Sequence, residues 1–129
     1  MVIVDSSVWI DLFRKRETPQ TATFYRLVGS ESIGLGDLVL YEVLQGVDPA
    51  ERIEKAKSYL LKFVLFTMGG RDMVLEAVRN AQVLRARGFQ PGTVDCLIVT
   101  LCLITGSKLL TSDRHFQPFA DILGLELAL

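Results

Sequence analysis

The sequence has few of the features that define several large classes of protein. Its 129 residues include only two cysteines and one histidine, and the longest stretch without a charged side chain, residues 96–107, has 12 residues. A membrane-spanning helix needs about 20 apolar residues, so we expect no transmembrane segment. The N-terminus also lacks the basic and then apolar layout of a signal peptide. We therefore expect a cytoplasmic protein in which Cys96 and Cys102 are reduced and buried.

No sign of charge dominates the chain, and no segment divides it. The 14 basic and 15 acidic side chains leave a net charge of −1, which argues against broad electrostatic capture of nucleic acid. There is no internal repeat, low-complexity tract or linker, so residues 1–129 should form one domain. Half of the residues are apolar and the mean hydropathy is +0.34. We expect part of this apolar surface to be buried in a homodimer or a tight heterocomplex.

Strand-like and helix-like segments alternate along the whole chain. This alternation predicts a three-layer α/β/α sandwich around a mostly parallel sheet. The apolar stripe from Val74 to Leu84 should face the core. The expected strands cover residues 2–4, 32–35, 63–67, 108–111 and 125–129, with a short turn over 115–121. The expected helices cover residues 8–13, 38–45, 49–61, 71–87 and 94–105, and a further helix starts at Pro19 with Thr18 as its N-cap.

Four acidic residues stand among apolar neighbours, where a charge is costly. Asp5 and Asp113 each follow an expected strand, and Asp95 lies in the first turn of the most apolar helix. Glu42 shares a helix face with Val39. Ligands and catalytic groups collect at the carboxyl ends of parallel strands, so all four carboxylates could meet at one edge of the sheet.

Such a cluster of carboxylates would repel itself unless a cation neutralised it. Carboxylate oxygens with retained waters suit Mg²⁺ or Mn²⁺. One or two such ions generate a hydroxide nucleophile and stabilise the charge of a phosphate under attack. Each aspartate also has a structural explanation, as a helix cap, a first-turn residue or a turn residue. Glu42 has no capping role available, so it argues most strongly for a functional site.

Four short motifs resemble those of one family, the PIN-domain ribonucleases. Asp5-Ser6-Ser7 follows the first strand, and Glu42 lies in Leu40-Tyr-Glu-Val-Leu-Gln-Gly46. Asp95 lies in Gly92-Thr-Val-Asp95 before an apolar helix, and Asp113 lies in Leu110-Thr-Ser-Asp-Arg-His-Phe116. Each motif is short, but all four occur in the family's order and spacing. Length and layout resemble the VapC-type toxins of toxin–antitoxin pairs.

The resemblance implies a PIN-like fold and a metal-dependent endoribonuclease. It implies that Asp5, Glu42, Asp95 and Asp113 are the catalytic metal ligands, for Mg²⁺ or Mn²⁺. Ser7 and Thr111 would orient these acids or bind phosphate through their hydroxyls. The implied partners are an RNA substrate, a cognate antitoxin whose tail fills the acidic pocket, and a second copy of the chain.

Two further polar residues lie close to these motifs in the sequence. A general base is not needed where a metal supplies hydroxide, so we expect His115 to be a partly exposed residue at a helix start. Asp11 could support the cluster indirectly, although a solvated position is the simpler expectation.

Basic and aromatic residues leave two alternatives open. The run Arg14–Arg16 and the pair Arg85 and Arg87 could contact RNA phosphates or be plain solvated charges. Trp9 and Phe13 should pack in the core, with a place in an antitoxin groove as the alternative.

Other classes that place acids at a strand edge fit less well. A haloacid-dehalogenase-like phosphatase needs a second Asp two residues after the first, where this chain has Ser7. A receiver domain needs a phosphoacceptor Asp after a central strand, and the segment Phe63–Gly70 offers none. A structure-specific DNA nuclease would need more acids and a helical arch. The remaining alternative is a non-catalytic, metal-stabilised binding module.

Overall fold

Four short parallel strands form the centre of the molecule. The computed structural model describes residues 1–129, and its sheet has the order β3-β2-β1-β4. Central β1 pairs with β2 (Val2 opposite Ile33) and with β4 (Val4 opposite Leu110). Because β1 is fully buried, its β-branched residues suit a central position. The strands are β1 (Val2–Val4), β2 (Ile33–Gly36), β3 (Val64–Phe66) and β4 (Lys108–Leu110).

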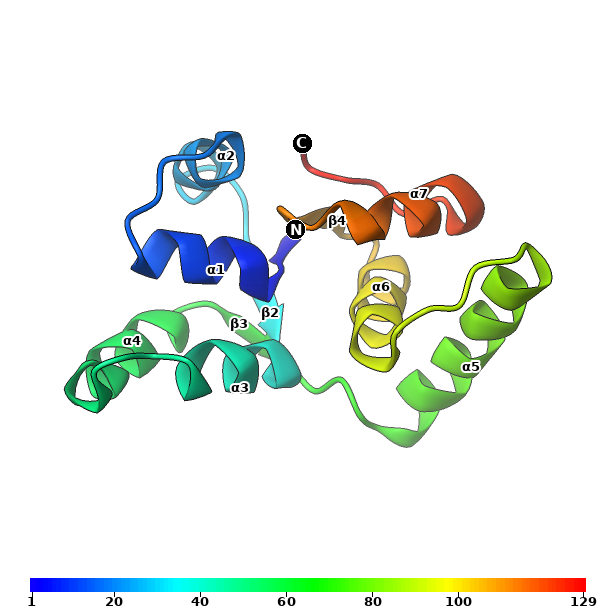
Figure 1. The fold of residues 1–129 in the computed structure, drawn as a ribbon, viewed down its shortest axis with the longest axis horizontal. Helices are drawn as coiled ribbons and strands as arrows, with labels where there is room; N and C mark the ends of the chain where they lie inside the picture. The colour runs from blue at the N-terminus through cyan, green and yellow to red at the C-terminus, as the bar shows by residue number, and fades with distance from the viewer.

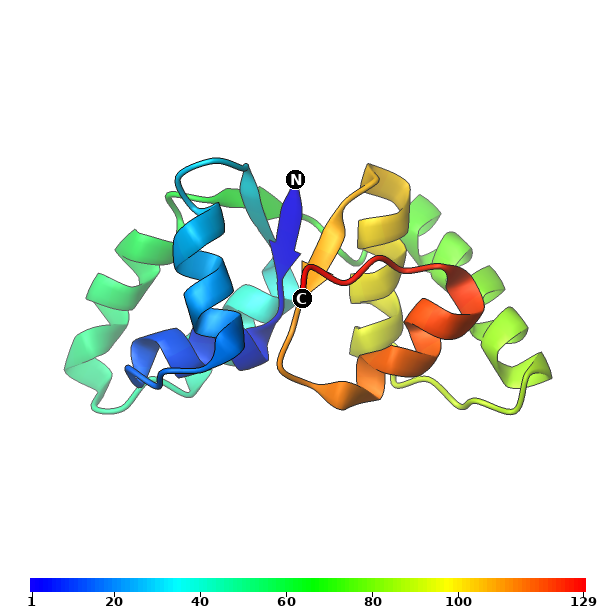
Figure 2. The same ribbon diagram turned by 90° about the horizontal axis from the view of Figure 1, so that it is seen from above.

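Seven α-helices cover the sheet. Figures 1 and 2 show α1 to α4 gathered to one side of the strands and α5 to α7 to the other. This is the expected three-layer α/β/α arrangement, and no helix combines the length and apolar character needed to cross a membrane. The helices are α1 (Ser6–Phe13), α2 (Pro19–Leu27), α3 (Asp37–Gln45), α4 (Ile53–Leu60), α5 (Arg71–Ala86), α6 (Thr93–Thr105) and α7 (Gln117–Leu123), with 3-10 turns at Ala50–Arg52 and Arg114–Phe116.

Large aromatic side chains anchor α1 to the sheet. Trp9 is fully buried, and its indole N–H donates to the carbonyl of Val4 at 3.0 Å. Its ring packs edge-on against Phe24 of α2, with ring centroids 5.2 Å apart. The core position expected for Trp9 is confirmed. Cys96 and Cys102 are likewise buried and free, as expected.

The end of the chain differs from the sequence-based expectation. Residues 115–121 form part of a 3-10 turn and α7 rather than a simple turn, because Phe116 and Phe119 are spaced to bury one face. The closing segment 125–129 forms one parallel bridge, Leu127 with Leu109, instead of a strand. Two backbone hydrogen bonds hold this bridge, from the Leu109 N–H to the Glu126 carbonyl and from the Ala128 N–H to the Leu109 carbonyl.

The expected core stripe of α5 is only partly buried. Ala77, Ala81 and Leu84 face the core, whereas Val74 and Val78 are 41% and 49% exposed. The small alanines let α5 approach α6 closely, and the Cys96 thiol donates to the Ala77 carbonyl. This close contact sets the rotation of the helix and turns both valines outward.

Chain direction brings the ends of several elements to one edge of the sheet. Asp5 follows β1 and Thr111 follows β4, and these two strands are parallel neighbours. Helix α3 starts directly after β2 and therefore at the same edge. Helix α6 leads back to the start of β4, so its N-terminal turn, with Asp95, returns to this edge as well.

Candidate active site

Asp5 is the buried centre of a hydrogen-bond network at this edge. Its Oδ2 accepts hydrogen bonds from the hydroxyls of Ser7, at 2.8 Å, and Thr111, at 2.9 Å. Its main-chain carbonyl accepts from the N–H groups of Val8 and Trp9 at the start of α1. Side chain and backbone are thus both fixed, which leaves Oδ1 as the less engaged oxygen.

Ser7 and Thr111 also hold the loop that follows β4. Ser7 Oγ accepts from the Ser112 N–H at 3.0 Å, and Thr111 Oγ1 accepts from the Asp113 N–H at 3.0 Å. Each hydroxyl therefore links Asp5 to the segment that carries Asp113. The orienting role of Ser7 and Thr111 stays a prediction.

Glu42 reaches the same edge from α3, between buried Val39 and Val43. Burial is the main cause that raises its pKa, and the charge of Asp5 raises it further. Ser6 Oγ lies 3.4 Å from Glu42 Oε2 and 3.5 Å from Asp5 Oδ1, so it bridges the two acids.

Asp95 lies within electrostatic range of the other three acids. Burial, as the largest cause, and the charges of Asp5, Asp113 and Glu42 together raise its pKa to about 6. All three other carboxylates therefore act on Asp95 electrostatically, although they come from three other parts of the chain. The charge of His115 has the opposite effect and lowers this pKa.

Asp113 is held by a residue that the sequence analysis treated as incidental. Its Oδ1 accepts from the His115 main-chain N–H at 2.9 Å and lies 2.8 Å from His115 Nδ1. His115 is exposed at the start of a 3-10 turn, as expected, but its contact with Asp113 was not foreseen. The bridging position of Ser6 was missed too, although its place directly after Asp5 was a usable signal.

The donor groups at this edge fit a hard divalent cation. Glu42 Oε1 and Ser112 Oγ are buried and have no hydrogen-bond partner, so both are available to an ion or to its waters. No three Asp, Glu, His or Cys side chains are arranged to hold one ion by themselves. Mg²⁺ typically uses one or two carboxylates and keeps several waters, so a looser set of carboxylates suffices.

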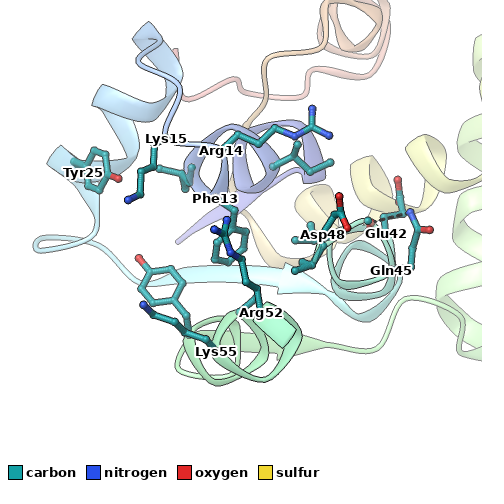
Figure 3. Close-up of a pocket in the computed structure, with 16 residues that line it drawn as sticks. Phe13, Arg14, Lys15, Tyr25, Glu42, Gln45, Asp48, Arg52 and Lys55 are labelled. Carbon is teal, nitrogen blue, oxygen red and sulfur yellow. Dashed lines mark hydrogen bonds between the residues drawn. The ribbon is translucent and has the colours of Figure 1, made fainter. Parts of the chain in front are cut away.

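A cleft of about 1160 Å³ extends from Glu42 between α1 and α4. Figure 3 shows Arg14, Lys15 and Tyr25 on one side and Arg52 and Lys55 on the other. Two members of the basic run 14–16 therefore line the cleft that extends from Glu42. Phe13 also lines this cleft and is half-buried, whereas Trp9 does not line it.

Asp11 does not join the carboxylate cluster. Its Oδ1 lies 3.5 Å from Arg16 Nη1, and its carbonyl accepts from the Arg16 N–H. It is half-buried rather than solvated, because Arg16 covers it. Its role is to close the turn after α1.

The chain belongs to the PIN-domain family. The family model described as PIN domain matches residues 2–122, which spans β1 to α7 and includes all four acids. The family expected from the four motifs is thus confirmed.

Similar proteins cover nearly the whole chain. Ribonuclease VapC32 of Mycobacterium tuberculosis is 29% identical over 129 residues, which are 99% of this chain and 97% of that protein. Ribonuclease VapC19 of the same species is 26% identical over 123 residues, 95% of this chain and 97% of the other. A chain of a toxin–antitoxin complex from Klebsiella pneumoniae matches with a TM-score of 0.77 at 17% identity, over 100% of this chain and 98% of that chain. The structural match shows that the fold is shared.

Proposed function

We propose that the protein is a metal-dependent endoribonuclease and the toxin of a type II toxin–antitoxin pair. The observation that carries the proposal is the convergence of four carboxylates at one sheet edge, where three of them raise the pKa of the fourth. Membership of the PIN-domain family and similarity to two VapC ribonucleases support the same activity. The single nuclease domain that we propose for residues 1–129 is supported by one core of 26 buried residues.

Asp5, Glu42, Asp95 and Asp113 would hold Mg²⁺ or Mn²⁺. When bound, the ion would supply the positive charge that stabilises the phosphate and favours attack by water. Ser7 and Thr111 fix the orientation of Asp5, and Glu42 keeps one oxygen without a partner. The Ser112 hydroxyl, also without a partner, is available to a phosphate oxygen. Hydrolysis forms a bond from phosphorus to the water oxygen and breaks the bond to a ribose oxygen, which takes up a proton.

We infer three further properties of the protein. The protein would bind a cognate antitoxin, since a chain of the same fold belongs to a toxin–antitoxin complex. We expect the tail of this antitoxin to fill the acidic pocket. The protein would act in the cytoplasm. It would also form a homodimer, which the exposed apolar side chains of α5 and of edge strand β3 support.

The test is cleavage of total cellular RNA by the purified, antitoxin-free protein. Wild type should give discrete fragments with Mg²⁺ or Mn²⁺ and none with EDTA, and Asp5→Asn should give none in either case. Absence of cleavage by folded wild type, with several RNAs and both metals, would contradict the proposal. It would favour the non-catalytic, metal-stabilised binding module.

A further inference from the structure

The cleft beside the acidic edge carries an unusual set of charges. Two acidic residues, Glu42 and Asp48, lie towards one end, and four basic residues line the rest: Arg14, Lys15, Arg52 and Lys55. Figure 3 shows Arg14 and Lys15 facing Arg52 and Lys55 across the opening, with Glu42 and Asp48 grouped on α3 and the turn after it. The chain as a whole has a net charge of −1, so this concentration of basic residues is local.

None of these four basic side chains has an acidic partner within the molecule. The ion pairs of the structure use other residues, such as Lys57 with Glu54 and Arg79 with Glu76. Unpaired cations on both walls of one cleft repel each other, and an anion between them would remove this repulsion. An extended polyanion fits better than a single ion, because the basic side chains line two opposite walls.

Aromatic side chains line the same part of the cleft. Tyr59 is half-buried and packs edge-on against Phe63 and Phe13, so its ring is held in place. Tyr25 is 65% exposed and close enough to Tyr59 for its charge to raise the pKa of Tyr59, after the larger effect of burial. Aromatic rings beside basic residues are the usual platform for unpaired bases, which stack on the ring while the phosphates contact the cations.

We propose that this cleft binds single-stranded RNA and leads it to the carboxylates. Phosphates would contact Arg14 and Lys15 on one wall and Arg52 and Lys55 on the other, and bases would stack on the exposed ring of Tyr25. Because Glu42 lines the cleft and belongs to the acidic edge, a strand in the cleft would pass its backbone across the proposed active site. The inference rests on the proposed ribonuclease activity and adds where the substrate binds.

The charge part of the inference is tested with Arg52→Gln/Lys55→Gln. The matched control is Lys57→Gln/Arg79→Gln, which removes the same charge from two residues outside the cleft lining. Binding of a labelled single-stranded RNA is measured by fluorescence anisotropy in EDTA at several salt concentrations. Each phosphate contact with a single strand makes the slope of log K against log salt more negative by about 0.7. The cleft variant removes two such contacts, so its slope should be about 1.4 less negative than that of wild type. Its affinity should fall on the order of tenfold, and the control should bind like wild type.

The aromatic part is tested with Tyr25→Leu against Tyr41→Leu. Tyr41 is 69% exposed on α3 and does not line the cleft, so the two substitutions remove equally accessible rings. Tyr25→Leu should weaken RNA binding on the order of tenfold without changing the salt slope, since it removes stacking and no charge. Tyr41→Leu should leave affinity unchanged.

Cleavage assays separate failure of the inference from failure of the proposed function. With Mg²⁺, the cleft variants should raise the KM for RNA and leave kcat within about twofold, because the carboxylates are unaltered. If wild type cleaves RNA but the cleft variants match the controls in affinity, salt slope and KM, the inference is wrong. The cleft would then be interpreted as a binding site for a segment of a partner protein. If wild type cleaves no RNA, the proposed function itself fails, and RNA affinity in EDTA still shows whether the cleft binds a strand.

Discussion

Asp113 has one carboxylate oxygen that is engaged twice by a single residue. The backbone N–H and the ring Nδ1 of His115 both contact Oδ1, at 2.9 and 2.8 Å. This arrangement leaves Oδ2 without a contact to His115. His115 therefore acts as a positioning residue, although its ring is exposed to solvent.

We expect His115→Ala to weaken metal activation more than it weakens folding. The concentration of Mg²⁺ for half-maximal cleavage should rise several-fold, because Asp113 loses one of the two contacts that hold it. His115→Asn should largely restore the wild-type value, since its side-chain N–H₂ can replace Nδ1 as a donor. Cleavage measured over a magnesium titration, with a thermal melt of each variant, tests this. Equal metal dependence of all three proteins would show that the contact has no role.

Asp95 makes stability depend on pH in a defined direction. Its pKa in the folded protein is raised from 3.8 to about 6, so the folded state binds more protons than the unfolded state between these values. The free energy of unfolding should therefore fall as the pH rises from about 4 to about 6, when EDTA keeps divalent metal away. Burial, the main cause, and three neighbouring carboxylates act in the same sense.

Urea denaturation at several pH values within this window measures the effect. In Asp95→Asn the decline should be smaller, because the variant lacks the carboxyl that contributes most to it. Saturating Mg²⁺ should also reduce the decline in wild type. The same pH dependence of stability in wild type and Asp95→Asn, in EDTA, would contradict the raised pKa of Asp95.

The sequence was most informative at the residue scale where a charge had apolar neighbours. Glu42 could be singled out because a glutamate beside Val39 on one helix face must meet something that compensates its burial. The contacts of Ser6 and His115 could not be foreseen. They depend on the distance between segments that only tertiary packing brings together, and serine and histidine are common at exposed helix starts.

At the scale of elements, the pairing of β1 with β4 determines the site. It places Thr111 beside Asp5, and the Thr111 hydroxyl donates to Asp5 and accepts from the Asp113 N–H. Thr111→Val keeps the shape of the side chain and removes both hydrogen bonds. We expect a loss of about 1–3 kcal/mol in stability, because a partly buried N–H is left unpaired. Cleavage should fall at least tenfold, because Asp5 loses a partner.

Thr105→Val is the matched control for this prediction. Thr105 bonds the Leu101 carbonyl at the far end of α6 and makes no contact with the acids. Thr105→Val should cleave RNA at the wild-type rate, whereas Thr111→Val should cleave at least tenfold more slowly. Urea denaturation measures the stability of both variants. Retention of full activity by Thr111→Val would mean that the link between the two strands does not orient Asp5.

The elements themselves were predictable where sequence pattern and packing agree. The buried β-branched run of β1 and the cap Thr18 before Pro19 led to the right elements, and the Thr18 hydroxyl accepts from the Thr21 N–H as a cap should. The rotation of α5 was not predictable. Helix α5 has more apolar residues than α6 can cover. The sequence does not show that the alanines, rather than Val74 and Val78, pack against α6.

At the scale of the whole molecule, the outward valines of α5 bear on assembly. Together with Leu75 and Val83 they form an exposed apolar face on one helix. In a homodimer this face would be buried, so Val78→Glu should shift the protein from dimer to monomer. Light scattering after size-exclusion chromatography measures the mass. Val28→Glu, at a residue that is 39% exposed at the end of α2, is the control and should leave the dimer intact. A monomeric wild type would refute the dimer.

The central claim is that the convergent carboxylates catalyse hydrolysis, and Glu42→Gln tests it most directly. The substitution keeps the size of the side chain and removes a charge that burial disfavours, so folding should be unchanged or slightly stabilised. The rate of cleavage of a defined RNA with Mg²⁺ should fall at least a hundredfold, while the thermal melt in EDTA stays at or above that of wild type. A Glu42→Gln protein that cleaves RNA at the wild-type rate would contradict the account, because the acidic edge would then not be the active site.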